Sequence, residues 1–244
     1  SLKLKEGCDK LNWECSEIPR WYKYDSSGRG TKQSMTETLI PKFLKNGGKL
    51  VYNSEVISIK NINKLNYIKV KSNDGKIIEF SSEYLFICAG AINSPFILLK
   101  SGIKRKIGKS LKLHPTFKFI SLFNEEINSI ENGVHVHQVK EFSPKISMGC
   151  SISSKGMLSV GLNDCNNIQY IKDWKKMSTY YTMISPEGTG SVNCLPFFNS
   201  PLVRFSLTRD DYLNLYSGIR KLAKILFNAG ARSLFPSVSS NIKI

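Results

Sequence analysis

The chain has 244 residues, 41% of them hydrophobic, and its 35 Lys and Arg against 19 Asp and Glu give a formal net charge of +16. This length and apolar content are enough to bury a core in one large domain or two small ones. The charge could attract nucleic acid, an anionic membrane or an acidic partner, but the lysines are scattered and form no arginine stripe or aromatic ladder. We therefore expect an ordinary solvated surface and no nucleic-acid partner.

The cysteine spacing argues against a metal centre. The six cysteines include no Cys-x-x-Cys pair and stand at positions 8, 15, 88, 150, 165 and 194. No apolar run approaches the length of a transmembrane segment, and the N-terminus lacks the charged-then-apolar order of a secretory signal. Because Cys88 stands in an apolar segment, we expect a reducing, cytoplasmic location and no metal.

The first part of the chain is predicted to pass from a loop to a helix and then to strands. Residues 1–30 look irregular, like a covering loop. A helix is predicted over 34–46, with Ser34 and Glu37 spaced as a capping box and glycines at 47 and 48 ending it. Strands are predicted over 50–59 and as a pair over 66–80 that turns at Asp74 and Gly75.

A strand, a turn and a helix are predicted in succession at residues 84–102. Residues 84–87, Tyr-Leu-Phe-Ile, are typical of a strand buried in a parallel sheet. Residues 89–91, Ala-Gly-Ala, then let another group approach the backbone closely.

The helix of this junction is predicted from its ends. Asn93 or Ser94 can cap it, Pro95 suits its first position and Gly102 supplies the left-handed stop. A helix opened in this way presents free N–H groups and a positive dipole end, which favours a phosphate.

An antiparallel sheet is predicted from Phe117 onward, because short segments alternate apolar and polar residues. These segments are 117–123, 133–139, 145–152, 157–162, 191–197 and 202–207. A helix follows, with Thr208 as its cap, Asp211 three residues on and Gly230 after its end. Its apolar stripe is expected to pack in the core and consists of Tyr212, Leu215, Tyr216, Ile219, Leu222, Ala223 and Leu226.

Two of the three histidines share one face if their segment is a strand. His135 and His137 flank Val136, a geometry that could bind a metal or face a substrate. No third metal ligand is evident, so we expect both on a partly exposed sheet face.

The central motif resembles the second signature region of the glucose-methanol-choline (GMC) family of FAD-dependent oxidoreductases. That pattern runs Gly-Ala-Ile-x-Ser-Pro, a leucine-rich helix, Ser-Gly-Ile, and then Gly-Lys/Arg-Asn/Ser-Leu-x-x-His-Pro. The matching residues here are Gly90, Ala91, Ile92, Ser94, Pro95, Leu98, Leu99, Ser101, Gly102, Ile103, Gly108, Lys109, Leu111, His114 and Pro115. Two linked segments in the right order are hard to obtain by chance.

The resemblance implies an FAD cofactor and the residues near it. The family residue at the position of Val56 meets the adenine through its backbone, although an ordinary core valine would read the same way in the sequence. The other implied cofactor-binding residues are Ala89, Gly90, Ala91 and Ser94. The position of His114 in the family supports the turn of the flavin domain and is not the base.

The implied reaction is oxidation of the CH–OH group of a small-molecule alcohol. A histidine accepts the hydroxyl proton while hydride passes to the flavin N5, and oxygen or another acceptor then reoxidises the flavin. The Leu-x-x-His-Pro form and the segment 32–35, Lys-Gln-Ser-Met, lean toward the long-chain alcohol oxidase and bacterial alcohol dehydrogenase branch. The sequence specifies neither the alcohol nor the oligomeric state.

Two parts of the family pattern do not occur in this sequence. No strand is followed by Gly-x-Gly-x-x-Gly, and the family's catalytic histidine with its His/Asn partner is expected beyond residue 244. We therefore expect an internal portion of a longer enzyme and leave the catalytic residues unassigned.

The expected fold class is α/β in an incomplete, Rossmann-like FAD-binding domain at 1–115, followed by an α+β substrate domain with an antiparallel sheet at 116–244, whose C-terminal part is missing. Two other functions stay open. One is a non-catalytic remnant of this fold, and the other is a basic nucleic-acid-binding module, which only the charge favours.

Overall fold

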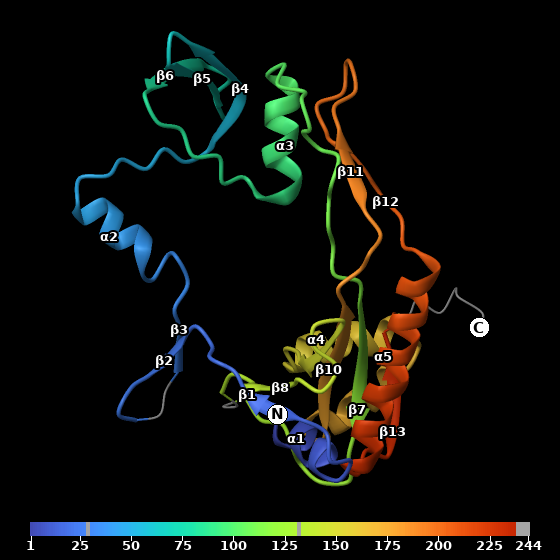
Figure 1. Cartoon of the computed structure of the whole chain (residues 1–244). Helices are drawn as coiled ribbons and strands as arrows, with labels where there is room; N and C mark the ends of the chain where they lie inside the picture. Colours follow the sequence, from blue (N-terminus) through green and yellow to red (C-terminus); the bar gives the residue numbers. More distant parts are fainter. Residues whose placement is uncertain (28–29, 131–132, 238–244) are drawn as a thin grey trace. The chain divides into compact units, whose positions relative to one another are not determined.

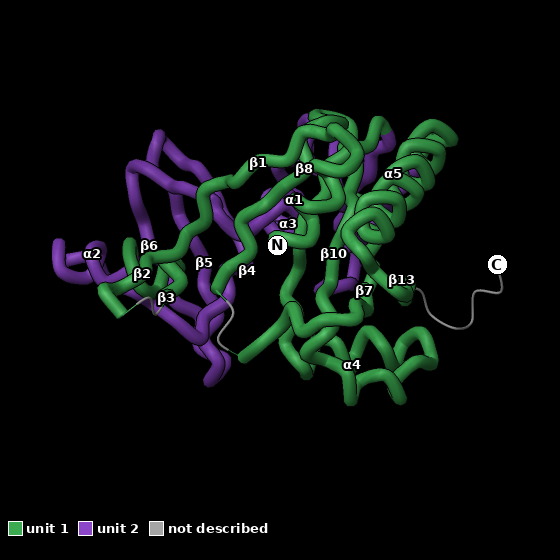
Figure 2. Tube along the Cα trace, turned by 90° about the horizontal axis from the view of Figure 1, so that it is seen from below, with its two compact units in different colours: residues 1–39, 114–187, 208–244 green, residues 40–113, 188–207 purple. Residues whose placement is uncertain are grey.

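The computed structural model describes residues 1–27, 30–130 and 133–237. The chain forms two compact units, each made of separate chain segments (Figure 2). Unit 1 takes residues 1–39, 114–187 and 208–244, and unit 2 takes residues 40–113 and 188–207. The predicted domains 1–115 and 116–244 were assigned by cofactor and substrate binding, and that assignment stays a prediction.

Unit 1 is built on a six-stranded antiparallel sheet (Figure 1). In spatial order its strands are β1 (Cys15–Glu17), β8 (His137–Val139), β9 (Ile146–Cys150), β10 (Met177–Ile184), β7 (Thr116–Leu122) and β13 (Ser233–Pro236). A separate two-stranded ladder pairs β2 (Tyr22–Tyr24) with β3 (Gly30–Lys32). The long central strand β10 was not among the predicted segments. Its buried hydroxyl residues Ser178, Thr179 and Thr182 hide the apolar pattern that would mark it.

Helices cover both faces of this sheet, as Figure 2 shows for α4 and α5. The helices of unit 1 are α1 (Leu2–Asp9), α4 (Lys155–Asp164), the 3₁₀ segment η1 (Ile168–Lys176) and α5 (Arg209–Asn228). Adjacent β7 residues point to opposite faces, so Phe119 packs in the core with α1 and α5, whereas Ile120 packs in the core with α4. The sheet is thus the middle layer of three.

Unit 2 combines a three-stranded antiparallel sheet with a helix and a hairpin. The sheet has the order β4 (Ser54–Ile62), β5 (Leu65–Ser72) and β6 (Ile77–Ser82). The other elements are α2 (Leu39–Lys45), α3 (Gly90–Lys100) and the hairpin of β11 (Gly190–Asn193) with β12 (Leu202–Phe205). A small core of Phe96, Leu111 and Val192 joins α3 to β11.

The expected fold class is confirmed: helices combine with sheets, and the sheet of the later part is antiparallel. The predicted β5–β6 pair is also confirmed. Gly75 has φ +84 at its turn, and Ile68 and Val70 are buried.

The predicted loop over 1–30 is wrong in its described part, because α1, β1 and β2 lie there. Leu4 and Cys8 of α1 are fully buried in the unit 1 core, and Gly7 lies so close to α5 that a Cβ atom would stand 2.1 Å from the Ile225 carbonyl oxygen. This segment is therefore part of the core and no covering loop.

The predicted strand over 157–162 is wrong, because these residues lie in helix α4. Leu158 and Leu162 are four residues apart and fully buried, a spacing that fits a helix as well as alternation fits a strand. The Ser154 hydroxyl accepts a hydrogen bond from the Met157 N–H and caps the helix. The side-chain cap at Ser154 favours the helix over the strand.

The helix predicted over 34–46 starts later, at Leu39. Pro41 explains the shift: it lies in the first turn of α2, where a missing N–H costs nothing, whereas a start at Ser34 would put it in the helix interior. The predicted Ser34–Glu37 capping box therefore does not form. The end is as predicted, with Gly47 at φ +82. The strand predicted over 50–59 is wrong in its first residues, 50–53, since β4 begins at Ser54.

The predicted capping box of α5 is confirmed. The Thr208 hydroxyl accepts from the Asp211 N–H, and the Asp211 carboxylate accepts from the Thr208 N–H. Two residues of the predicted stripe, Tyr212 and Tyr216, are exposed instead of buried. The stripe runs too wide because the sheet contacts a narrower face of the helix, whose buried residues are Asp211, Gly218, Leu222, Ile225 and Leu226.

Candidate functional site

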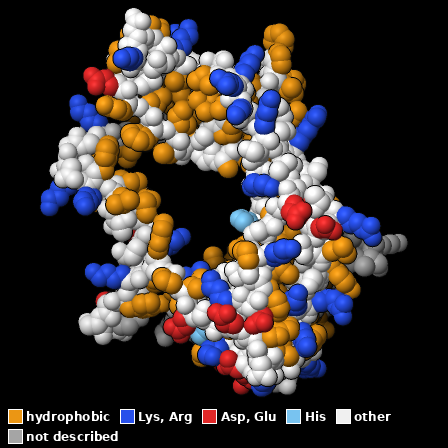
Figure 3. Space-filling view, in the orientation of Figure 1, with side chains coloured by type: hydrophobic (Ala, Val, Ile, Leu, Met, Phe, Trp, Pro, Cys, Tyr) orange, Lys and Arg blue, Asp and Glu red, His pale blue; other side chains and the backbone are white. Residues whose placement is uncertain are grey.

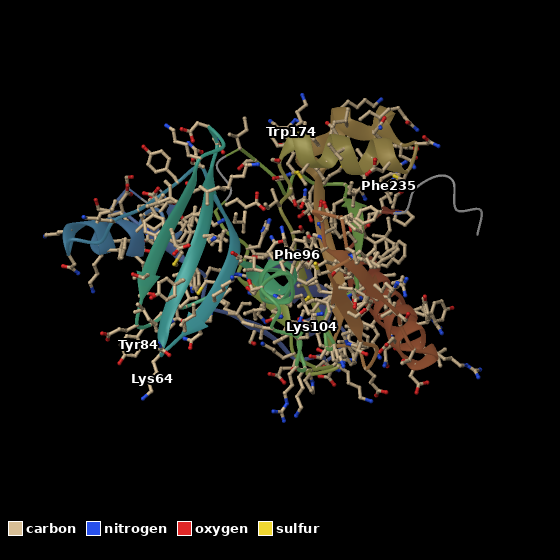
Figure 4. All side chains as sticks on the ribbon, turned by 90° about the horizontal axis from the view of Figure 1, so that it is seen from above. Lys64, Tyr84, Phe96, Lys104, Trp174 and Phe235 are labelled. Carbon is tan, nitrogen blue, oxygen red and sulfur yellow. The ribbon has the colours of Figure 1, made fainter. Side chains whose placement is uncertain are left out.

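The segment before α3 is extended but is not a strand. No ladder of the described residues includes residues 84–88, so the predicted buried parallel strand is wrong. Tyr84 and Phe86 are 80% and 86% exposed, and Figure 4 labels Tyr84 at the edge of the β4–β6 sheet, near Lys64. Without a neighbouring strand to pair with, the apolar run has no layer to pack in.

Helix α3 starts at Gly90, several residues before the predicted cap. Its N-cap residue is Ala89, no side chain caps it, and Gly90 has φ +85. Asn93 and Ser94 are therefore inside the helix, and so is Pro95, which has no N–H to donate to the Ala91 carbonyl. The Gly-Ala-Ile of the motif is thus the first turn of the helix.

The four predicted site residues of this turn lie together, and three of them are open to solvent. Ala89, Gly90 and Ala91 are exposed, whereas Ser94 is half-buried. A Cβ atom at Gly90 would meet nothing within 4 Å. The first N–H groups of α3 have neither an intrahelical acceptor nor a side-chain cap, so this end of the helix can donate hydrogen bonds to an anionic or carbonyl oxygen.

The end of α3 follows the prediction. Ser101 is the C-cap, Gly102 has φ +84, and the Ile103 N–H donates to the Leu98 carbonyl at 3.0 Å. The motif serine also contacts the neighbouring sheet, since the Ile59 N–H donates to the Ser101 hydroxyl. This link between α3 and β4 carried no sequence signal, because a serine before a glycine is ordinary at a helix end.

Val56, the fifth predicted site residue, lies on the strand that α3 contacts. It is half-buried, pairs with Val70 of β5 and stands at a β-bulge between Val56 and Ser58. β4 is the edge of its sheet. An edge strand with a bulge leaves backbone groups without a sheet partner, which is what backbone recognition of a ligand needs.

The second half of the motif is structural. Gly108 has φ +73, and a Cβ atom there would stand 2.1 Å from the carbonyl oxygen of Val192, whose N–H donates to the Gly108 carbonyl at 2.8 Å. Leu111 exchanges two backbone hydrogen bonds with Gly190. Together they attach the chain after α3 to the β11–β12 hairpin.

The His114 ring lies 3.1 Å from the Ile184 carbonyl oxygen through Nδ1. A carbonyl oxygen only accepts, so Nδ1 carries the proton and the ring fixes the end of β10. This geometry assigns the His114 ring no role in proton transfer.

The other two histidines differ from the pair that was expected on one partly exposed strand face. His137 is 4% exposed in β8, with its Nδ1 at 3.1 Å from the Ser1 hydroxyl, and His135 precedes the strand. The shared strand face was therefore a wrong prediction. Burial lowers the pKa of His135 to about 4, so its ring is neutral at pH 7.

A pocket lies in unit 1 beside His135. This pocket, about 550 Å³, also has apolar walls from Ile152 and Trp174, and polar groups from Asn128 and Ser153. The Asn128 amide donates to the Ser153 carbonyl at 2.7 Å, which fixes this side of the pocket. Such a mixture of apolar walls and a few fixed polar groups suits a small organic molecule.

The described residues also bear on metal binding and on membrane insertion. In the described residues, no three or more His, Cys, Asp and Glu side chains gather as a metal ion would need. None of the helices there combines the length and apolar composition of a membrane span.

Comparison with known proteins assigns the motif. Residues 3–116 match the GMC oxidoreductase family model. Over 255 aligned residues, the chain is 32% identical to an uncharacterized GMC-type oxidoreductase of Sinorhizobium fredii, covering 98% of this chain and 50% of that protein. The chain thus matches the GMC oxidoreductases in its first half through the family model, and along its length through this relative. It therefore spans about half the length of this relative.

More distant relatives carry an activity in their names. A long-chain-alcohol oxidase of Arabidopsis thaliana is 22% identical over 64% of this chain and 22% of its own length. A second one is 21% identical over 95% of this chain and 36% of its own length. Among solved structures, a flavoprotein/dehydrogenase of Cytophaga hutchinsonii matches with a TM-score of 0.34 and 10% identity, over 75% of this chain and 42% of that one.

Proposed function

We propose that this chain is part of an FAD-dependent oxidoreductase that acts on the CH–OH group of an alcohol. The observation that carries the proposal is the start of α3, where the family motif forms an exposed, uncapped helix end around Gly90. The family match over residues 3–116 includes this helix and Val56.

The residues at this helix end fit a flavin nucleotide. Ala89, Gly90 and Ala91 are exposed, and a Cβ atom added at Gly90 would have open space around it within 4 Å. Free N–H groups at a helix start favour the negative charge that a phosphate carries. We propose that Val56, Ala89, Gly90, Ala91 and Ser94 would hold FAD.

FAD, when bound, would supply the acceptor for a hydride from the alcohol carbon. The contribution that we derive for this chain is binding and orientation. A base at neutral pH needs a pKa near 7, and burial holds the pKa of His135 far below that. His114 and His137 are engaged with Ile184 and Ser1, so we assign the base to none of the three.

The proposed substrate is an apolar alcohol. The names of the Arabidopsis relatives favour a long-chain alcohol, and the apolar wall of the unit 1 pocket supports the same class. An alkyl chain gains free energy from leaving water, and the fixed polar groups around Ser153 could orient a hydroxyl.

The test compares two glycines that differ only in place. Gly90 and Gly75 have φ +85 and +84, and neither has an atom within 4 Å of its Cβ position. Leu should therefore strain both backbones equally, while only Gly90→Leu would fill the cofactor's space. We expect protein from the complete coding sequence to lose its flavin in Gly90→Leu and to keep it in Gly75→Leu, measured as flavin absorbance per purified chain.

His135→Ala serves as a second control, because this residue lies in unit 1 and outside the proposed cofactor residues. We expect its flavin content to stay unchanged. Full flavin occupancy in Gly90→Leu would contradict the proposed site. Wild-type protein that contains no flavin and takes none up would favour the non-catalytic remnant instead.

A further inference from the structure

The loop of the β11–β12 hairpin exposes large apolar side chains. Phe197 is fully exposed, and Phe198 and Leu195 are 64% and 39% exposed. We call these three residues the aromatic tip. Burying a phenylalanine side chain contributes a large favourable free energy. Two phenylalanines exposed in one hairpin loop forgo that free energy, so their exposure needs an explanation.

The backbone at the tip is also unfavourable for its residue. Phe197 has φ +66, a left-handed conformation that a bulky side chain rarely adopts. Backbone strain of this kind collects at functional sites. At Phe197 this conformation coincides with a fully exposed aromatic ring.

Three lysines lie beside the aromatic tip. Lys100, Lys104 and Lys109 line one side of a groove of about 760 Å³, and residues 193–199 line the other. We call these lysines the basic collar. Within the described residues none of the three forms a salt bridge, and Arg105 and Lys106 add charge next to Lys104, which Figure 4 labels.

Acidic residues are absent from both segments that form the groove. Residues 84–124 and 188–209 contain no Asp or Glu. Figure 3 shows the hydrophobic end of the hairpin with Lys and Arg side chains beside it. Elsewhere on this chain carboxylates stand among the lysines and arginines. The two segments of the groove carry only positive charge.

We propose that the aromatic tip and the basic collar dock unit 2 onto an anionic lipid bilayer. Aromatic side chains favour the interface between headgroups and acyl chains, and lysines favour a surface of negative headgroups. The lysine stems are long enough to lie along the apolar boundary while their ammonium groups stay among the headgroups. This docking needs no membrane-spanning helix.

The charge selects this occupant over others. A second copy of the chain would bring its own basic collar against the first, which is repulsive. A nucleic acid would match the charge, but a single strand favours a row of aromatic side chains on which successive bases stack, and of the described residues that line the groove only Phe197 and Phe198 are aromatic. A bilayer matches both the charge and the apolar tip.

The test is flotation of the purified chain with lipid vesicles. We expect binding to vesicles of equal parts phosphatidylcholine and phosphatidylserine, little binding to phosphatidylcholine alone, and weaker binding as NaCl rises. The double variant Phe197→Asn with Phe198→Ser should bind at least about tenfold less tightly. Asn tolerates positive φ, so this variant keeps the hairpin.

Matched controls remove the same groups elsewhere in unit 2. Lys104→Gln with Lys109→Gln should weaken binding about thirtyfold. Lys60→Gln with Lys64→Gln, on exposed positions of the β4–β5 hairpin, removes the same charge and should weaken it much less. Tyr52→Ser, at a residue 75% exposed, should leave binding unchanged.

Each opposing result overturns the proposal. It fails if the chain does not float with anionic vesicles, if the control pairs weaken binding as much as the tip and collar variants, or if phosphatidylcholine alone binds equally. It also fails if the tip variant abolishes a dimer seen by sedimentation without vesicles, or abolishes binding to a single-stranded oligonucleotide while vesicle binding persists.

Discussion

The Ser101 hydroxyl joins the end of α3 to Ile59 of β4. It accepts a hydrogen bond from the Ile59 N–H at 2.8 Å and donates one to the Ile97 carbonyl at 2.7 Å. One side chain thus caps a helix and holds the outer edge of a sheet. The helix that carries the proposed cofactor site is fixed to β4 at the opposite end from that site.

Replacing Ser101 with alanine should loosen this junction. We expect Ser101→Ala to lower the free energy of unfolding by about 1–2 kcal/mol, because the Ile59 N–H loses its partner in a partly buried place. Urea unfolding measures the loss. Ser54→Ala is the matched control, since the Ser54 hydroxyl donates to the Tyr52 carbonyl on an exposed part of unit 2. Equal losses in both variants would show that the junction contributes nothing special.

A methyl group at Gly108 should be more damaging than one at Gly75. Both glycines have positive φ, so alanine costs about 1–2 kcal/mol at each. At Gly108 the methyl also strikes the Val192 carbonyl and forces β11 away, so we expect a total of roughly 3 kcal/mol or more. Thermal unfolding compares the variants. A Gly108→Ala protein as stable as Gly75→Ala would contradict the close approach.

Two neighbouring aspartates at the start of α5 should differ sharply. Asp211 is 1% exposed, and its carboxylate accepts from the N–H groups of Glu187 and Thr208 at 2.8 and 2.9 Å. We expect Asp211→Ala to cost about 2–4 kcal/mol, since it leaves buried donors without acceptors. The exposed Asp210 lies in the first turn of α5, where its charge interacts with the helix dipole, so Asp210→Ala should cost less than about 1 kcal/mol. Chemical denaturation that ranks them the other way would refute this assignment.

His135 should make stability depend on pH. Its pKa falls from 6.5 to about 4 because the ring is partly buried, so the unfolded chain takes up a proton before the folded chain does. Its contribution is therefore fully present above about pH 6.5 and is lost as the pH falls toward 4, by roughly 2 kcal/mol. Unfolding curves of wild type and His135→Gln at several pH values test this. The variant should show a smaller loss between about pH 7 and pH 4, and an identical slope would argue against the lowered pKa of His135.

The sequence predicted the structure correctly where the deciding contacts lie between residues close together in the chain. Thr208 with Asp211, the turn at Gly75 and the stop at Gly102 depend on residues a few positions apart, and all three formed as predicted. The candidate site at residues 89–94 was also found in the sequence, through its likeness to a known motif. Whether those residues bind a cofactor stays a prediction.

Sequence reasoning failed where distant contacts decide. Residues 84–87 have the composition of a buried strand, but the described chain places no strand beside them. The buried hydroxyls of β10 are hidden between two helical layers that the local pattern does not reveal. The bond between Ser101 and Ile59 joins residues from separate elements, so no spacing rule could predict it.

The division of unit 1 among three chain segments has a consequence for the order of folding. Strand β7 pairs Leu122 with Ser233 of β13, whereas β4, β5 and β6 pair through short turns. During synthesis the β4–β6 meander can close as soon as its own residues emerge, but β7 must wait for β10 and then for β13, which are far from it in the sequence. Until β13 emerges, the longer strand β7 is itself an unpaired strand edge, and such an edge exposes a nascent chain to aggregation.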